Sequence, residues 1–380
     1  MVIMKMEGEM SNFAMVWITV VASLWYCHAI AKITKQGPKR FVVILPVTLL
    51  FFVLPLNLST ICLGGPTSFF IAWLATFKLI LFSFGKGPLS SDPPHSMARF
   101  ISFACFPVKL EENPTNSTTN GDDPNYPTPE KPVKKPAQKS LHSYLLKGII
   151  FSSMFFVYQN KSSLHPKLFL LMYSVYTYTS LEVMLAIVAA IVRAYLGVEL
   201  EPQFDDPYMA TSVQDFWSRR WNIMVSKVLR PTVYVPVRTV SKHVVGNNWA
   251  AIPGVVAVFI VSGIMHEWIF YIIGRSKPTG EIGLFFVLQG VCMALEIIVK
   301  RMAHGKWRLP PRVSGTMAVS FVLVTAVWLF LPGMMRYNSD VMAYREMVGL
   351  IRYVKTLGSR LRLIEKGSNY SVFSSLHNRI

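Results

Sequence analysis

The residues best suited to chemistry lie in one apolar stretch, residues 251–273, which contains the motif SGIMHE. The motif places His266 and Glu267 where ionisable side chains are costly and usually functional. A zinc protease would need the second histidine of H-E-x-x-H, but position 270 is Phe. A serine hydrolase would need G-x-S-x-G, and Ser262 lacks the preceding glycine. A lone histidine that takes a proton from an alcohol or amine needs neither motif, so we expect His266 to be a general base.

The pair also has a structural interpretation. His266 could be held by a neighbouring helix without taking part in a reaction. Glu267 lies about 100° around the helix from His266, which favours a structural contact on another face. In a later apolar run, Glu296 has Lys300 one turn further on as a ready partner.

A second cluster precedes this run, in the segment TSVQDFWSRRWNIMVSKVLRP. Ser212 has the residue type of an N-cap, and Asp215 follows three residues on. The apolar positions that follow share one helical face: Val213, Trp217, Trp221, Met224 and Val228. The pattern predicts an amphipathic helix in the membrane interface, which ends before Pro231.

The same segment has a functional interpretation. Arg219 and Arg220 could meet the phosphates of a cofactor, since guanidinium groups bind phosphate strongly. Asn222, an uncharged hydrogen-bonding group near the apolar face, would then point into the site. An interfacial helix alone would also explain most of these residues, so both interpretations stay open.

Membrane helices must position these residues. Of the 380 residues, 52% are apolar and only 15% charged. The apolar residues gather in runs of about 20, which cross a bilayer as helices. The fold class is therefore all-α, a polytopic transmembrane bundle of about eight or nine spans. Helices are predicted over residues 13–31, 41–63, 67–84, 144–160, 168–195, 251–273, 282–302 and 313–333.

The net charge of +18 lies mostly in loops beside these runs. The odd-numbered loops are the basic ones, which predicts that they are cytoplasmic and that the N-terminus is outside. Membrane lipids and an acidic substrate are expected partners, and nucleic acid is not. The 4 cysteines are isolated and form no CxxC motif, so no metal site or disulfide framework is expected.

We expect one membrane-embedded domain over residues 1–380. Residues 111–139 are rich in Pro, Asn and Thr and should form a disordered cytosolic loop. Residues 340–380 form a basic tail, which an even number of crossings would place outside, against the positive-inside rule. Either one crossing is miscounted, or residues 340–357 are a ninth membrane or interfacial segment.

The motifs DFWSRRWN and SGIMHE, together in one multi-span chain, resemble the plant wax synthase branch of the membrane-bound O-acyltransferases. The stretches PLNLS, FKLILFSFGKGPL, ELEPQF and LRPTVY are similar to the same branch. The resemblance implies that His266 is the catalytic histidine and that Asn222 is paired with it. Ser218 stands where glycine is expected, which bears on substrate detail and not on the chemistry.

The resemblance also implies acyl-CoA as co-substrate, with no bound cofactor, and a location in the endoplasmic reticulum membrane. The acceptor would be a lipophilic alcohol: a long-chain fatty alcohol that gives a wax ester, or else a sterol or diacylglycerol. The residues expected to contact substrates are Trp217, Arg219, Arg220, Trp221 and Glu267. A lipid transporter or scaffold is the alternative from another class, and the lack of an internal repeat speaks against it.

The depth of His266 has a consequence for substrate entry. It lies 15 residues beyond Ala251, roughly 22 Å along a helix and past the middle of a core about 30 Å thick. Because the headgroup of acyl-CoA cannot enter lipid, we expect an internal tunnel from the 196–250 loop to His266. Asn222 should border the same cavity, and the acceptor should arrive sideways from the bilayer.

Overall fold

The computed structural model describes residues 2–90, 95–108, 141–197, 200–303 and 309–346, with single positions up to 359. The regular structure of these residues is helical apart from one isolated β-bridge, between Val108 and Leu200. Seven helical stretches are long and apolar enough to cross a membrane. The predicted all-α, multi-pass class is therefore confirmed. The segment 111–139 and most of the tail 340–380 lie outside the described residues.

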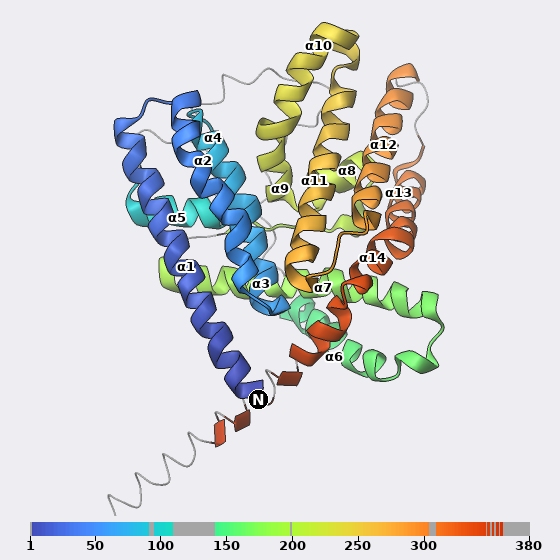
Figure 1. The fold of residues 1–380 in the computed structure, drawn as a ribbon. Coiled ribbons are helices and arrows are strands. Elements are labelled where there is room, and N and C mark those ends of the chain that lie inside the picture. Colours follow the sequence, from blue (N-terminus) through green and yellow to red (C-terminus); the bar gives the residue numbers. More distant parts are fainter. Residues whose placement is uncertain are drawn as a thin grey trace, which may run out of the picture.

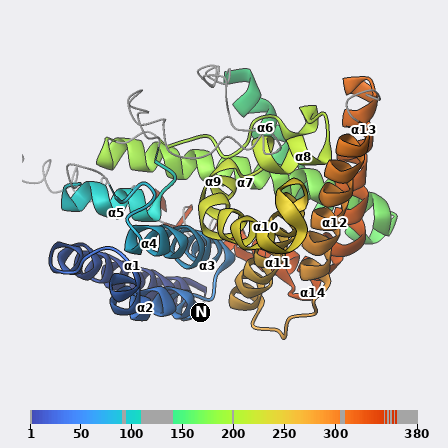
Figure 2. The same ribbon diagram turned by 90° about the horizontal axis from the view of Figure 1, so that it is seen from above.

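The N-terminal part of the chain forms the first block of the bundle. This block consists of α1 (Val2–Ile33), α2 (Pro38–Val53), α3 (Ile61–Thr67), the π-helical segment η2 (Ser68–Ala75) and α4 (Thr76–Ser83). The helices of this block lie side by side, in blue, in Figures 1 and 2. Within an apolar 18-residue part of the continuous run Ile61–Ser83, 78% of the residues are buried, the largest such share among the seven stretches. This run therefore forms the inner wall that this block presents to the rest of the protein.

The C-terminal half forms the second block. It consists of α10 (Val235–Trp249), α11 (Ala251–Gly274), α12 (Glu281–Met302), α13 (Pro311–Thr325), η7 (Ala326–Phe330) and α14 (Leu331–Arg336). The backbones of α11 and α12 approach closely at two glycines, since a Cβ on Gly263 would lie 3.1 Å from the Cα of Gly283. Small residues allow such close packing of membrane helices. The pair α11–α12 thus gives His266 a rigid support.

Two helices depart from the predicted arrangement. The segment predicted at 144–160 lies in α6 (Leu141–Gln159), whose apolar part is shorter than the seven spanning stretches. α7 (Pro166–Leu196) is apolar and long enough to span, but in both views it runs across the direction of α1, α11 and α12. Seven stretches of the described chain, α7 among them, have the length and composition of a span, beside the eight or nine predicted for the whole chain. Hydropathy alone cannot distinguish a crossing helix from one that lies across a bundle.

The turns of the bundle fall at two ends. The α1–α2 turn, the α10–α11 junction and the last turn of α12 share the upper end in Figure 1. The α1–α2 turn carries Lys32, Lys35 and Lys39. The last turn of α12 carries Lys300 and Arg301. If the basic loops are cytoplasmic, as predicted, they must lie at the same end of the bundle, and these two do.

The start of the C-terminal tail returns to the opposite end. The carboxylate of Glu346 accepts the backbone N–H groups of Ile61 and Cys62, at 2.6 and 2.8 Å, where α3 begins. Tyr344 stacks on Tyr158 with ring centroids 4.6 Å apart. Up to Glu346, therefore, the tail is held at the α3 end and does not start a further crossing.

The predicted amphipathic helix over residues 213–230 is broken. It divides into α8 (Val213–Asp215), the π-helical η5 (Phe216–Arg220), α9 (Ile223–Leu229) and the π-helical η6 (Arg230–Tyr234). Between η5 and α9, Asn222 adopts a left-handed φ of 44°. The Arg220 carbonyl there accepts the N–H of Asp205 at 2.9 Å. The N–H of Ile223 donates to the carbonyl of Gln203 at 3.0 Å. Helical periodicity does not predict this break, because it depends on pairing with the segment 203–205.

The beginning of this segment matches the prediction. The Ser212 hydroxyl accepts the N–H of Asp215 at 3.0 Å, as an N-cap does. The N–H of Val213 donates to the Glu296 carboxylate of α12 at 2.9 Å. Glu296 also pairs with Lys300, its predicted partner. These contacts fix the start of the motif against the second block.

A buried lysine joins the first block to the short helix α5 (Met97–Cys105). Lys78 of α4 is only 1% exposed, and its Nζ donates to the carbonyls of Phe103 and Phe106, each at 2.7 Å. The last carbonyls of a helix have no partner within the helix. Lys78 therefore satisfies two acceptors at the end of α5 and holds this helix in place.

Replacing Lys78 by Met should lower the stability of the purified protein. The change removes the Nζ donor from the Phe103 carbonyl, while the Phe106 carbonyl keeps only the N–H of Val108 at 2.9 Å. An acceptor left without its partner costs about 1–3 kcal/mol. We expect the thermal unfolding midpoint in detergent to fall by about 5 °C or more. The matched control is Lys86→Met, at an exposed position just beyond the same helix, which should change little. Equal midpoints for the two variants would contradict the proposed anchoring role.

Candidate active site

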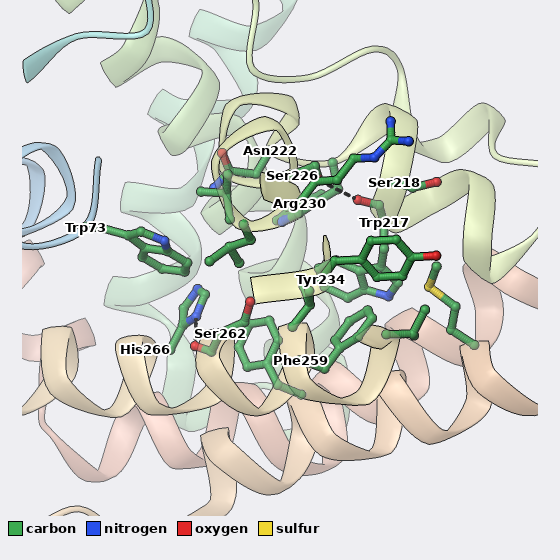
Figure 3. A pocket seen from close by; sticks show the side chains of 17 residues that line it. Trp73, Trp217, Ser218, Asn222, Ser226, Arg230, Tyr234, Phe259, Ser262 and His266 are labelled. Carbon is green, nitrogen blue, oxygen red and sulfur yellow. Dashed lines mark hydrogen bonds between the residues drawn. The ribbon is translucent and has the colours of Figure 1, made fainter. Parts of the chain in front are cut away.

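One pocket brings the two sequence motifs together. It contains about 630 Å³ of empty space, its open mouth included. Its wall comes from η2, the segment from η5 to η6, α11 and α12. Figure 3 shows Trp73 and His266 at one end, with Arg230 and Ser218 at the other. Of the predicted site residues, Trp217, Trp221, Asn222 and His266 line this pocket.

His266 is held in one orientation by its own helix. The ring Nδ1 lies 2.7 Å from the carbonyl oxygen of Ser262, one turn back along α11. A carbonyl can only accept, so Nδ1 carries the proton and Nε2 keeps its lone pair. No described residue forms a hydrogen bond with Nε2. The imidazole is thus arranged to accept a proton from a molecule in the pocket.

Aromatic rings enclose the imidazole. Phe286 stacks on it with ring centroids 4.2 Å apart. The edge of Trp73 approaches at 4.9 Å with the two rings perpendicular, and Phe330 lies at 6.2 Å. These rings come from α12, η2 and η7, so three separate elements fix the imidazole plane.

Asn222 has an unusual backbone and an unsatisfied side chain. Its left-handed φ of 44° is a conformation that asparagine tolerates better than most residues. Its side-chain Oδ1 is buried without a hydrogen-bond partner among the described residues. Buried polar atoms are rarely left unpaired in folded proteins. The amide therefore has hydrogen-bonding capacity that the described fold does not use, on the wall of the pocket that holds His266.

The π-helical segments of the described chain all border this site. η2 supplies Trp73, η5 supplies Trp217 and Ser218, and η6 supplies Arg230 and Tyr234 to the pocket wall. η7 supplies Phe330, which contacts the imidazole. A π-helical turn inserts an extra residue and changes the direction of the following side chains, and such turns are frequent at functional sites. The helices of both blocks thus depart from regular geometry where they meet the pocket.

A polar chain within the bundle holds Trp217. Its Nε1 donates to the Oε1 of Gln289 at 3.1 Å, and the Nε2 of Gln289 donates to the Thr325 hydroxyl at 2.8 Å. Gln289 is completely buried. The sequence pattern did not single out Gln289 or Thr325. A lone Gln in an apolar run was the available signal, because a buried amide needs partners.

Glu267 lies outside the pocket, contrary to its expected contact with substrate. One carboxylate oxygen accepts the N–H of Gly283 at 3.0 Å, and the other accepts the Tyr337 hydroxyl at 2.9 Å. Burial and the Glu267 carboxylate raise the pKa of Tyr337 to about 12, so the phenol stays protonated and donates at neutral pH. Glu267 therefore joins α11 to α12 and to the end of α14, the structural role that its helical position favoured.

The two predicted phosphate-binding arginines also lie away from the pocket wall. Arg219 is exposed, and Arg220 forms an ion pair with Asp215 at 2.9 Å. Arg220 also donates to the carbonyls of Asp205 and Asp206, at 3.1 and 3.2 Å. Arg220 therefore stabilises the break before Asn222. Arg230 lines the pocket instead, at the start of the π-helical segment η6.

The pocket follows one face of α11. Val255, Val258, Phe259, Ser262 and His266 line it, at the spacing of three or four residues that one helical face requires. From Val255 to His266 this face is roughly 16 Å long. The expected cavity beside His266 and Asn222 is therefore present, and it is elongated along the helix.

Comparison with known proteins agrees with these motifs. A model of the membrane-bound O-acyl transferase family matches residues 200–288. The chain is 41% identical to acyl-CoA–sterol O-acyltransferase 1 of Arabidopsis thaliana, over 87% of this chain and 92% of that protein. It is 40% identical to the long-chain-alcohol O-fatty-acyltransferase of Simmondsia chinensis, over 93% of this chain and 97% of that protein. With relatives this similar over most of its length, the chain belongs to the membrane-bound O-acyltransferase family.

Proposed function

We propose that this protein transfers a fatty acyl group from acyl-CoA to the hydroxyl group of a long-chain alcohol. The observation that carries the proposal is the hydrogen bond from Nδ1 of His266 to the Ser262 carbonyl, which leaves Nε2 as a base in the pocket. The similarity to a long-chain-alcohol O-fatty-acyltransferase over most of the chain supports the same acceptor. The membrane would be that of the endoplasmic reticulum, where both lipid substrates are expected.

The reaction needs one base and an arranged thioester. Nε2 of His266 takes the hydroxyl proton of the alcohol while the alcohol oxygen attacks the thioester carbonyl carbon. The carbon–sulfur bond then breaks, and the CoA thiolate takes the proton back from the imidazolium. The products are the ester and free CoA, with no acyl-enzyme. The Ser262 carbonyl stabilises the positive imidazolium, because its oxygen accepts the hydrogen bond from Nδ1–H throughout.

Asn222 and Arg230 are assigned to the thioester and to the CoA end. The Asn222 amide would orient the acyl group or the histidine from the wall of the same cavity. Arg230, at the opposite end of the pocket, would meet the phosphates of CoA, to which guanidinium groups donate paired hydrogen bonds. In this arrangement the pantetheine arm lies along the α11 face, and no bound cofactor is required.

Replacing His266 by Ala should reduce ester formation by at least about 100-fold, the lower range for loss of a positioned base. The assay incubates microsomes from a host without this activity with labelled acyl-CoA and a mixture of fatty alcohol, sterol and diacylglycerol. The control is His243→Ala, at an exposed histidine of α10, which should act like wild type. Turnover of the His266 variant at the wild-type rate would refute the mechanism. If the wild type forms no ester, the transporter or scaffold alternative is favoured. If the wild type forms only sterol esters, the acceptor is a sterol and not a long-chain alcohol.

Replacing Arg230 by Gln should raise the KM for acyl-CoA by about tenfold, the loss expected for a charge-assisted hydrogen bond. The KM should also become less sensitive to salt, while the KM for the alcohol should barely change. Arg219→Gln is the matched control, since Arg219 belongs to the same basic segment but is exposed and away from the pocket wall. A larger rise in the KM for acyl-CoA with Arg219→Gln than with Arg230→Gln would instead support phosphate binding at Arg219, as expected from the sequence.

A further inference from the structure

Trp73 is a pocket residue with a hydrogen-bond donor that the described fold does not use. It lies in η2 and is 1% exposed. It lines the pocket at the end where His266 lies. Its indole Nε1 is buried and has no hydrogen-bond partner among the described residues. An unsatisfied buried donor destabilises a protein, so such a group calls for an explanation.

Comparison with the other buried indoles shows why position matters. Trp217, in the same pocket, has its Nε1 satisfied by Gln289. Trp17 and Trp268 also have buried Nε1 atoms without a described partner, but neither belongs to the pocket wall. An unpaired indole is therefore not by itself a sign of function in this protein. Trp73 combines an unpaired donor with a place beside His266.

The geometry around His266 indicates what this donor would meet. The Trp73 ring is perpendicular to the imidazole, with centroids 4.9 Å apart. In Figure 3 its nitrogen edge is turned away from His266, to the side on which Asn222 lies. The Oδ1 of Asn222 is also buried and unpaired among the described residues. Two unused polar groups therefore share the end of the pocket where the base is located.

We propose that the indole N–H of Trp73 donates a hydrogen bond to the acyl carbonyl oxygen of the thioester. The inference rests on the proposed function, and it adds a catalytic residue to it. As the alcohol oxygen attacks, the carbonyl oxygen becomes negative, and a donor fixed beforehand stabilises that charge. An indole suits this role because it can only donate and cannot take the proton intended for His266. Burial in η2 keeps the donor in place, so it need not be reorganised during the reaction.

Replacing Trp73 by Phe removes the donor and keeps an aromatic ring beside His266. The kcat should fall by about 10²–10³, as for loss of one oxyanion donor, while the KM for acyl-CoA should stay within about threefold. The control is Trp268→Phe, which removes another unpaired indole N–H, from α11 but away from the pocket, and should leave kcat unchanged. If the wild type is active and the Trp73→Phe variant has the same kcat, this inference is overturned and the proposed function stands. An inactive wild type would instead overturn the proposed function.

Binding of two unreactive CoA compounds separates the donor from a purely structural role. One is a ketone in which CH₂ replaces the thioester sulfur, and the other is an S-alkyl thioether without a carbonyl. The Trp73→Phe variant should bind the ketone about threefold to tenfold more weakly, as expected for one hydrogen bond, and the thioether with unchanged affinity. Equal losses for both compounds, or no loss for either, would overturn the donor role.

A second substitution guards against misfolding of the Phe variant. Benzothienylalanine at position 73 keeps the shape of the indole and replaces the N–H by sulfur. It should reproduce the same loss of kcat and the same selective loss of ketone binding. Wild-type behaviour of this variant would overturn the proposal even if the Phe variant were inactive.

Discussion

The hydrogen bond from Nδ1 of His266 to the Ser262 carbonyl determines the chemistry of the site. It lies within one helix, so it needs no other element in order to form. It fixes the tautomer, it directs the free Nε2 toward the pocket, and it offers an acceptor for the proton of the imidazolium. In an apolar bundle, where water is scarce, this internal partner replaces the carboxylate that supports the histidine in many soluble enzymes.

The rest of the fold brings three other walls to this histidine. The closely packed glycines of α11 and α12 place Phe286 on the imidazole, and η2 places Trp73 at its edge. The break at Asn222 brings a polar amide to the same cavity. That break is stabilised by Arg220, which binds Asp215 and the carbonyls of residues 205 and 206. A basic residue that looked like a phosphate ligand thus supports the backbone that positions a site residue.

The sequence was sufficient for features that depend on local pattern. The apolar runs predicted the spanning stretches, Ser212 predicted a helix start, and Glu296 predicted its pair with Lys300. The expected cavity beside His266 followed from the depth of this residue and from the CoA headgroup, which cannot enter lipid, and the place of Asn222 on it followed from the family resemblance. The failures share a different cause. The break of the 213–230 helix and the course of α7 both depend on contacts between distant segments, which periodicity does not contain.

In the proposed reaction, acyl-CoA occupies the pocket with its thioester beside Nε2 of His266. The most direct measurement is an experimental structure of the protein with a bound, unreactive ketone form of acyl-CoA. We expect the carbonyl carbon next to Nε2, the pantetheine arm along the α11 face, and the phosphates near Arg230. Two results would contradict this arrangement: a ligand bound away from this pocket, or an imidazole turned so that Nδ1 rather than Nε2 faces the carbonyl group of the ligand.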